Sequence, residues 1–153
     1  MGPKFNSNYK GIRCRVCLVR EGNNEEVIKI HAPSEVYELV KDELATADRE
    51  TFLSVMFASR NILIGVETIS IGSVEGTIIT PRDVFKSAIL ANSVSIILCH
   101  NHPSGDLIPS KEDIETTKKL IDAGKLLGIN VLDHLIVSSE GYKSLREYYN
   151  FPE

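Results

Sequence analysis

Short runs of apolar residues alternate along the chain with segments of helical periodicity. Runs rich in Val and Ile between turn-forming residues predict β-strands, and apolar residues at helical spacing predict helices. Thr80 before Pro81 is a favourable start for a helix, and Gly128 is a favourable end. The expected strands are 12–19, 26–30, 52–59, 62–71, 94–98 and 131–137, and the expected helices are 34–44, 81–91 and 111–127.

This order of elements predicts an α/β fold in which one mixed β-sheet is flanked by helices in a single domain. Asn61 after Arg60 supplies a hairpin turn between two of the strands. The length of 153 residues, with 42% hydrophobic and 25% charged residues, agrees with one globular domain that buries a proper core.

Composition also bears on where the chain works. No apolar run is long enough to cross a bilayer, and the polar start is unlike a signal peptide, so we expect a soluble cytoplasmic protein without membrane contact. Three Cys residues, an odd number, argue against a disulfide framework. Cys14 and Cys17 have CxxC spacing but fall in an expected strand, so we interpret them as ordinary strand residues, and Cys99 as a core residue.

The most informative motif is the run from His100 to Asp113, which follows the expected strand 94–98. His100 and His102 point to the same side if the backbone stays extended, and Asp113 falls in the first turn of a helix that begins near Ser110. A catalytic zinc takes three such ligands and keeps a fourth position for water. The window therefore predicts an open zinc site with one ion.

A structural interpretation stands beside the chemical one. Ser110 and Asp113 have the spacing of a capping box, although that motif prefers Glu or Gln at its fourth position. For these two residues alone, capping is the simpler role. Capping does not explain a pair of His residues at a strand end, and both roles can hold together for Ser110.

The spacing of His100, His102, Ser110 and Asp113 resembles the JAMM (MPN+, Jab1-type) metalloprotease motif. The fuller string HNHPSGDLIPSKED, with Thr116-Thr117 and Leu132-Asp133-His134 after it, resembles the bacterial RadC branch of that superfamily. The resemblance implies a JAB1/MPN-like fold of cytidine deaminase-like architecture. We expect N-terminal strands in residues 1–32 and a RadC-like JAB/MPN metal-binding domain in residues 33–153.

The resemblance also implies roles for individual residues. His100, His102 and Asp113 match the zinc ligands, and Ser110 matches the serine that stabilises the oxyanion. An upstream Glu acts as general base in such enzymes. Glu50, just before an apolar run, fits that position, and Glu67 is the competitor.

Two further groups stay open. Asp133 and His134 could orient a ligand imidazole or add a ligand, and a structural role is the simpler interpretation of the pair. His31 has no partners in the sequence and is interpreted as a surface residue.

These features favour a zinc-dependent metallohydrolase, a peptidase or isopeptidase acting on a peptide or protein substrate. One alternative is a DNA-repair-associated protein or a metal-dependent nuclease, but the formal net charge of −4 disfavours direct nucleic-acid binding. The other is a non-catalytic MPN-type interaction domain. A homodimer is possible, because the expected strand 12–19 could pair between chains as an exposed edge.

Overall fold

The computed structural model describes residues 14–22, 26–72 and 78–151. Five strands form one sheet in the order β2-β1-β3-β4-β5. Strands β3 and β4 are parallel, and the other neighbours are antiparallel. The sheet is therefore mixed, as expected, and the bounds of its strands are β1 Thr51–Ala58, β2 Ile62–Ile71, β3 Ser95–Asn101, β4 Asn130–Ser138 and β5 Gly141–Ser144.

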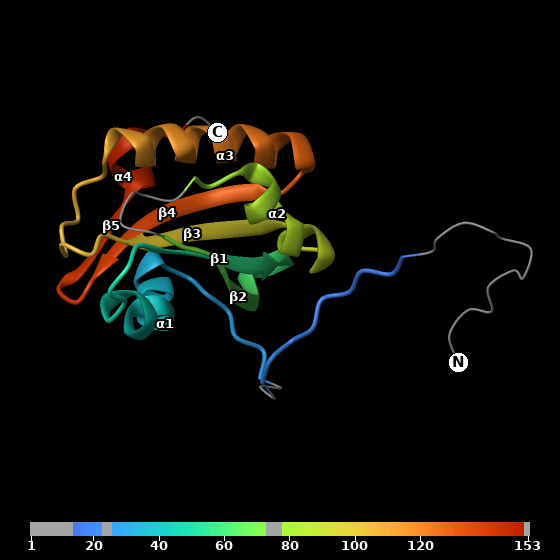
Figure 1. The fold of residues 1–153 in the computed structure, drawn as a ribbon. Helices are drawn as coiled ribbons and strands as arrows, with labels where there is room; N and C mark the ends of the chain where they lie inside the picture. Colours follow the sequence, from blue (N-terminus) through green and yellow to red (C-terminus); the bar gives the residue numbers. More distant parts are fainter. Residues whose placement is uncertain (1–13, 23–25, 73–77, 152–153) are drawn as a thin grey trace, which may run out of the picture.

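Helices cover both faces of this sheet (Figure 1). Helix α1 (Pro33–Ala45) packs on one face through its apolar stripe, while α2 (Pro81–Leu90) and α3 (Lys111–Leu127) pack on the other. The two apolar clusters meet at the central strands, whose residues are almost all buried. The chain is thus a three-layered α/β domain, with the short helix α4 (Leu145–Tyr149) after the last strand.

Local signals place the ends of several elements. Thr80 caps α2 by accepting a hydrogen bond from the backbone N–H of Asp83 at 3.3 Å. Gly128 ends α3 with a φ of 71°, in the left-handed region that glycine adopts most readily. Arg60 and Asn61 both have positive φ in the turn between β1 and β2, so the predicted hairpin is confirmed.

Helix α3 connects β3 to β4, and this crossover makes the two strands parallel. Their carboxyl ends therefore meet at the same edge of the sheet. On the other side of β3, Phe52 at the start of β1 pairs with His100 near the end of β3. Residues from the start of β1, the end of β3 and the middle of β4 are thereby brought next to the N-terminus of α3.

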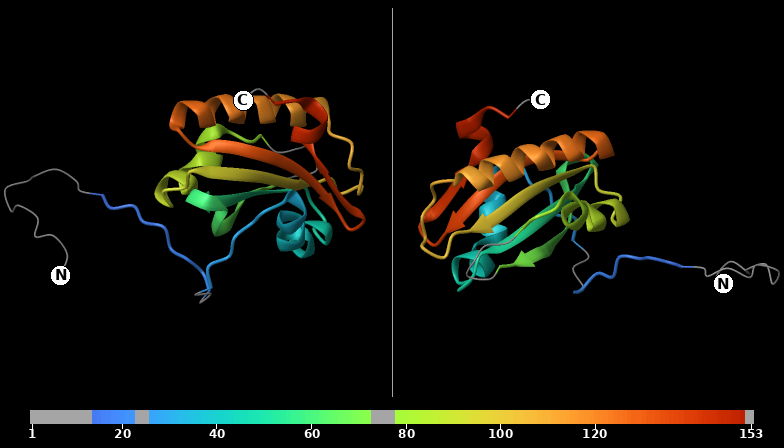
Figure 2. Two further views of the ribbon diagram at one scale, coloured as in Figure 1. Left: turned by 180° about the vertical axis from the view of Figure 1, so that it is seen from behind. Right: turned by 45° about the horizontal axis from the view of Figure 1, so that its top comes forward.

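The N-terminal strands were predicted wrongly where the chain can be described. Residues 14–20 form no strand and extend away from the sheet (Figure 2), and residues 12 and 13 lie outside the described residues. In the segment 26–30 only Lys29 forms a bridge, with Ile62. A segment with β-propensity forms a strand only when it pairs with a neighbouring strand, and residues 14–20 have no such neighbour among the described residues. The expected homodimer relied on an exposed edge strand in this segment, and its described residues do not form that strand.

Strand β5 and helix α4 were not predicted. Both are short, so neither has enough residues to show a clear hydrophobic period. A local signal was nevertheless present, because Ser144 caps α4 by accepting from the backbone N–H of Glu147 at 3.2 Å.

None of the helices in the described residues has the length and apolar character that crossing a membrane requires.

Candidate metal centre

The two histidines of the motif leave the end of β3 on the same side. His100 is fully buried at the penultimate position of the strand, and His102 is half-buried just after it. Their Nε2 atoms lie 3.0 Å apart. The expectation that extended backbone would point both rings the same way is met.

Asp113 comes to the two rings from the first turn of α3. Its Oδ1 lies 3.2 Å from Nε2 of His100, and its Oδ2 lies 3.1 Å from Nε2 of His102. One ligand atom from each of the three side chains lies within 4.8 Å of the others. Among the described residues, this is the group that could hold a metal ion.

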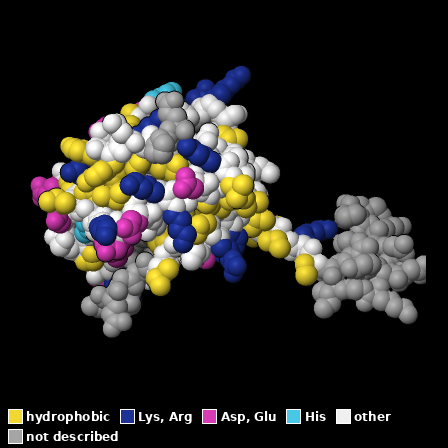
Figure 3. Space-filling view, turned by 90° about the horizontal axis from the view of Figure 1, so that it is seen from above, with side chains coloured by type: hydrophobic (Ala, Val, Ile, Leu, Met, Phe, Trp, Pro, Cys, Tyr) yellow, Lys and Arg dark blue, Asp and Glu magenta, His cyan; other side chains and the backbone are white. Residues whose placement is uncertain are grey.

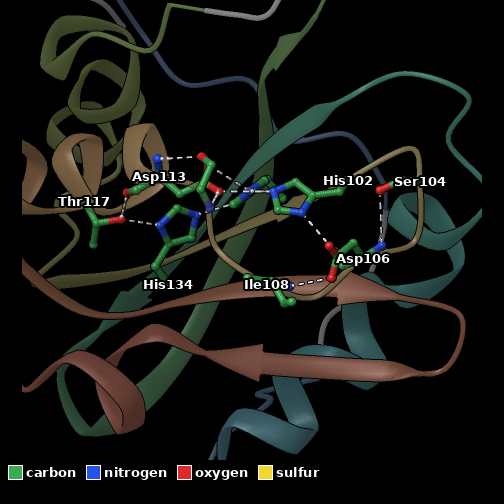
Figure 4. Close-up of polar contacts among 9 residues, drawn as sticks. His102, Ser104, Asp106, Ile108, Asp113, Thr117 and His134 are labelled. Atoms are coloured by element: carbon green, nitrogen blue, oxygen red, sulfur yellow. Dashed lines mark hydrogen bonds and ion pairs between the residues drawn. The ribbon is translucent and has the colours of Figure 1, made fainter.

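Hydrogen bonds on the far side of each ring fix its orientation (Figure 4). Nδ1 of His102 lies 2.8 Å from the backbone oxygen of Asp106, so this nitrogen carries the hydrogen and donates. The loop itself is held because the carboxylate of Asp106 accepts from the backbone N–H of Ile108 at 2.9 Å. Nδ1 of His100 lies 2.7 Å from Nε2 of His134. Each ligand ring thus keeps Nε2 for the centre.

Ser110 and Asp113 also form the capping box that their spacing predicted. The Ser110 hydroxyl accepts from the backbone N–H of Asp113 at 3.1 Å, and the carboxylate of Asp113 accepts from the backbone N–H of Ser110 at 2.7 Å. The capping role is confirmed, and the same carboxylate also faces the two rings, so capping is compatible with a place among the candidate ligands. Helix formation itself places this oxygen at the centre.

The chemistry of these groups fits a divalent cation. Two imidazole nitrogens and a carboxylate converge. When the rings are neutral and the carboxylate is ionised, the converging atoms are all hydrogen-bond acceptors, so a proton or a metal cation must lie among them. Burial by itself would raise the pKa of Asp113, but the hydrogen bonds with His100 and His102 hold that pKa well below its usual range. The hydrogen bond with Asp113 raises the pKa of His102, against the effect of burial. A cation with nitrogen and oxygen ligands meets the same need.

His102 and Asp113 line a cleft of about 770 Å³ that Glu50 also lines, and His100 is buried behind them. Glu50 is half-buried just before β1, and its charge contributes to the raised pKa of His102. The backbone on either side of Glu50 is anchored by Asn101. The amide oxygen of Asn101 accepts from the N–H of Thr51 at 2.7 Å, and its amide group donates to the carbonyl of Arg49 at 3.1 Å.

Asn101 was not singled out from the sequence, although a signal for it existed. Neighbouring residues of a strand point to opposite sides, so the residue between two ligands must face away from the centre. Asn101 is buried with both ends of its amide bonded to the segment that carries Glu50. The sequence His-Asn-His thus combines two rings that face the candidate centre with an anchor for the neighbouring strand.

Glu67, the competitor of Glu50, lies elsewhere. It is paired with Ser54 across β1 and β2 and does not line the cleft. Burial raises the pKa of its carboxyl, and the charge of Lys86 partly offsets this effect. One of its carboxylate oxygens is buried without a hydrogen-bond partner among the described residues. The structure therefore brings Glu50 to the three converging groups and leaves Glu67 apart.

Asp133 and His134 have separate surroundings. The carboxylate of Asp133 turns away from the centre, where it accepts from the Ser144 hydroxyl at 2.7 Å and from the backbone N–H of Arg146 at 3.1 Å. The side chain of His134 leaves β4 on the opposite face of the sheet from Asp133, where it is buried next to His100 and Thr117. The side chain that contacts the imidazole of His100 is therefore His134. The alternative in which the carboxylate of Asp133 orients this ring is not what the structure shows, and Asp133 has a structural role. His31 is exposed, as expected.

Known proteins resemble this chain over most of its length. Residues 30–150 match the family described as RadC-like JAB domain. The chain is 46% identical over 139 residues to a UPF0758 protein of Caldanaerobacter subterraneus subsp. tengcongensis, covering 90% of this chain and 58% of the relative. It is 49% identical over 122 residues to a UPF0758 protein of Staphylococcus haemolyticus, covering 80% and 54%. A UPF0758 protein of Methanosarcina mazei is 44% identical over 119 residues, covering 78% and 52%.

The chain spans about half the length of the curated relatives it matches. The matched segment runs from the residues before α1 to the end of α4, so it contains the whole sheet and every residue of the centre. From this match and from the residues gathered in the cleft, we conclude that the chain belongs to the RadC family and folds as its JAB domain.

Proposed function

We propose that this chain is a zinc-dependent hydrolase of amide bonds, a peptidase or isopeptidase. The observation that carries the proposal is the convergence of His100, His102 and Asp113 beside a cleft that Glu50 and Ser110 line. A zinc ion held by the three ligands would supply a Lewis acid for a carbonyl oxygen and would lower the pKa of a bound water to about 7.

Two residues of the cleft then have roles of their own. The carboxylate of Glu50 is the acceptor for the proton of the attacking water and returns it to the leaving amine. The hydroxyl of Ser110 donates to the oxygen that becomes negatively charged as the carbonyl is attacked. Asn101 holds the backbone around Glu50, which limits the freedom of this carboxylate.

The lining of the cleft favours an amide over a phosphodiester as substrate. Glu50, Asp106 and Glu112 line it together with the ligand Asp113, and no Lys or Arg is among the described residues that do so. A phosphate backbone is bound through basic side chains, and this cleft would repel it. Apolar contacts are also available, because three isoleucines border the cleft: Ile78, Ile79 and Ile108.

Among the described residues, the surface above α3 carries no continuous basic tract either. Figure 3 shows Lys and Arg side chains dispersed among acidic and hydrophobic ones over this face. Along the helix, the exposed Lys118 and Lys119 are followed by Asp122 and preceded by Glu115. This mixture supports a peptide or protein substrate over nucleic acid. The complete set of candidate ligands supports an enzyme over a silent interaction domain.

Replacing the proposed base tests this function. Glu50→Gln should lower amide hydrolysis at least about 100-fold, because the amide cannot accept the proton. Zinc binding should persist, since Glu50 is not among the ligands. Glu67→Gln is the matched control, because it removes the same charge outside the cleft and should leave the rate unchanged.

The assay uses the zinc-loaded chain with a peptide library and Lys ε-amide-linked peptides, read by mass spectrometry, with single-stranded DNA in parallel. Cleavage of amides that stops with chelator supports the proposal. Cleavage of DNA alone, or no chelator-sensitive amide cleavage, would overturn it. A loss of activity in Glu67→Gln but not in Glu50→Gln would reassign the base.

A further inference from the structure

A chain of buried polar contacts runs behind the metal centre. His134 in the middle of β4 is 1% exposed, and its Nε2 lies 2.7 Å from Nδ1 of His100. Its other nitrogen, Nδ1, lies 2.6 Å from Oγ1 of Thr117, which is fully buried in α3. The hydroxyl of Thr117 donates to the backbone oxygen of Asp113 at 2.6 Å. The contacts thus start at one proposed ligand and end at the backbone of another (Figure 4).

The direction of each hydrogen bond in this chain follows from its last acceptor. A backbone carbonyl can only accept, so the single hydroxyl hydrogen of Thr117 is used by Asp113. Oγ1 of Thr117 must then accept from His134, which places the ring hydrogen of His134 on Nδ1. Nε2 of a neutral His134 is left as an acceptor, and Nδ1 of His100 must donate to it.

His100 is thereby held in one tautomer. With its hydrogen on Nδ1, the ring presents a lone pair at Nε2, and this is the atom that faces His102 and Asp113. The opposite tautomer would place a hydrogen where a cation has to bind. The orientation of the ring is held as well, because Phe52 stacks on His100 with ring centroids 5.9 Å apart and packs edge-on against His134 at 5.3 Å.

We propose that His134 and Thr117 are positioning residues, which hold His100 in the Nδ1–H tautomer and aim its Nε2 at the metal. The inference rests on the proposed metal site, but it does not depend on which bond is hydrolysed. Partners of this kind are known to matter for metal sites, where their loss typically weakens metal affinity about 10- to 100-fold. A neutral acceptor here also adds no negative charge to the centre, unlike the carboxylate often found in this place.

Thr117→Val is the decisive variant, because it keeps the shape of the side chain and removes the hydroxyl. We expect zinc affinity to fall about 10- to 100-fold, measured by competition with a chromophoric chelator. Thr117→Ser should restore the affinity, since the hydroxyl returns. Ser54→Ala is the matched control, because Ser54 is fully buried in β1 and its hydroxyl has no partner among the described residues. His134→Leu should resemble Thr117→Val if it folds.

A second readout reports the tautomer directly. Long-range ¹H–¹⁵N spectra of the zinc-free chain should show a hydrogen on Nδ1 of His100. In Thr117→Val the two tautomers should mix. If Thr117→Val lowers the urea midpoint but keeps both zinc affinity and the tautomer of His100, the residue is merely structural and the inference is wrong. Absence of amide cleavage by the unaltered chain would defeat the proposed function and leave this result intact.

Discussion

Cys99 and His100 are neighbours on β3, and their side chains leave the strand on opposite faces. Cys99 joins the apolar cluster under α1, whereas His100 faces Asp113 in the candidate metal centre. The sequence-based interpretation of Cys99 as a core residue is confirmed. Strand alternation therefore separates a sulfur from the candidate centre although the two residues are adjacent in sequence.

The three thiols should differ sharply in reactivity. Burial raises the pKa of the Cys99 thiol well above its usual range, so the reactive thiolate is not formed at pH 8. Cys14 and Cys17 are exposed and should be alkylated. Iodoacetamide treatment of the folded chain, followed by peptide mass spectrometry, should label these two and spare Cys99 until denaturant is added. Equal labelling of all three in the folded chain would contradict the buried position of Cys99.

At the scale of elements, the first turn of α3 combines a helix cap with part of the candidate centre. Ser110→Ala should therefore have two effects. Loss of the cap should lower the free energy of unfolding by about 1 kcal/mol. Loss of the proposed oxyanion donor should lower the rate of amide cleavage about 100- to 1000-fold.

Thr80→Ala separates these effects, because Thr80 caps α2 in the same way. It should reduce stability by about as much and leave the rate constant for cleavage unchanged. Urea denaturation and single-turnover kinetics give the two numbers. If Ser110→Ala and Thr80→Ala behave alike in both measurements, Ser110 is a cap and has no role in catalysis.

A second element-scale prediction concerns the start of α4. Asp133 accepts from Ser144 and from the backbone of Arg146, next to the helix N-terminus. Asp133→Ala would leave these donors without their partner and should lower the free energy of unfolding by about 1–3 kcal/mol per unsatisfied buried group. Zinc affinity should stay unchanged, because Asp133 faces away from the ligands. A selective loss of zinc binding without loss of stability would contradict this assignment.

At the scale of the whole molecule, the apolar core and the candidate metal site are distinct. The two apolar clusters lie between the sheet and its helices, so the fold should persist without metal. Zinc should still raise the melting temperature, because a ligand that binds only the folded chain stabilises it. When the free zinc concentration is 100 times the dissociation constant, the free energy of unfolding increases by about 2.7 kcal/mol. For a chain of this size this corresponds to an increase in melting temperature of roughly 5–10 °C.

His102→Ala is the control for that thermal shift. It removes one proposed ligand at a half-buried position, so the zinc-dependent increase should disappear while the zinc-free melting temperature changes little. Differential scanning calorimetry with and without chelator measures both. An equal increase in His102→Ala would mean that zinc binds somewhere other than at this centre.

The elements that could be predicted are those with local signals. The bounds of β2 and α3 agree with the predicted ranges, because turn residues and caps mark their ends in the sequence. The pattern in residues 12–19 resembles a strand as much as that of β2 does, but residues 14–20 have no strand to pair with in the described part of the chain. Strand formation depends on a partner from elsewhere in the chain, and a local pattern does not contain that information.

The sequence by itself determined the candidate ligands, because His100, His102 and Asp113 lie within one strand end, one turn and one helix start whose geometry is local. Only the tertiary structure decided that Glu50 lines the cleft and Glu67 does not, and that His134 contacts His100 across 34 positions of sequence. These contacts depend on the register of neighbouring strands. Register results from packing over the whole sheet, which no short segment specifies.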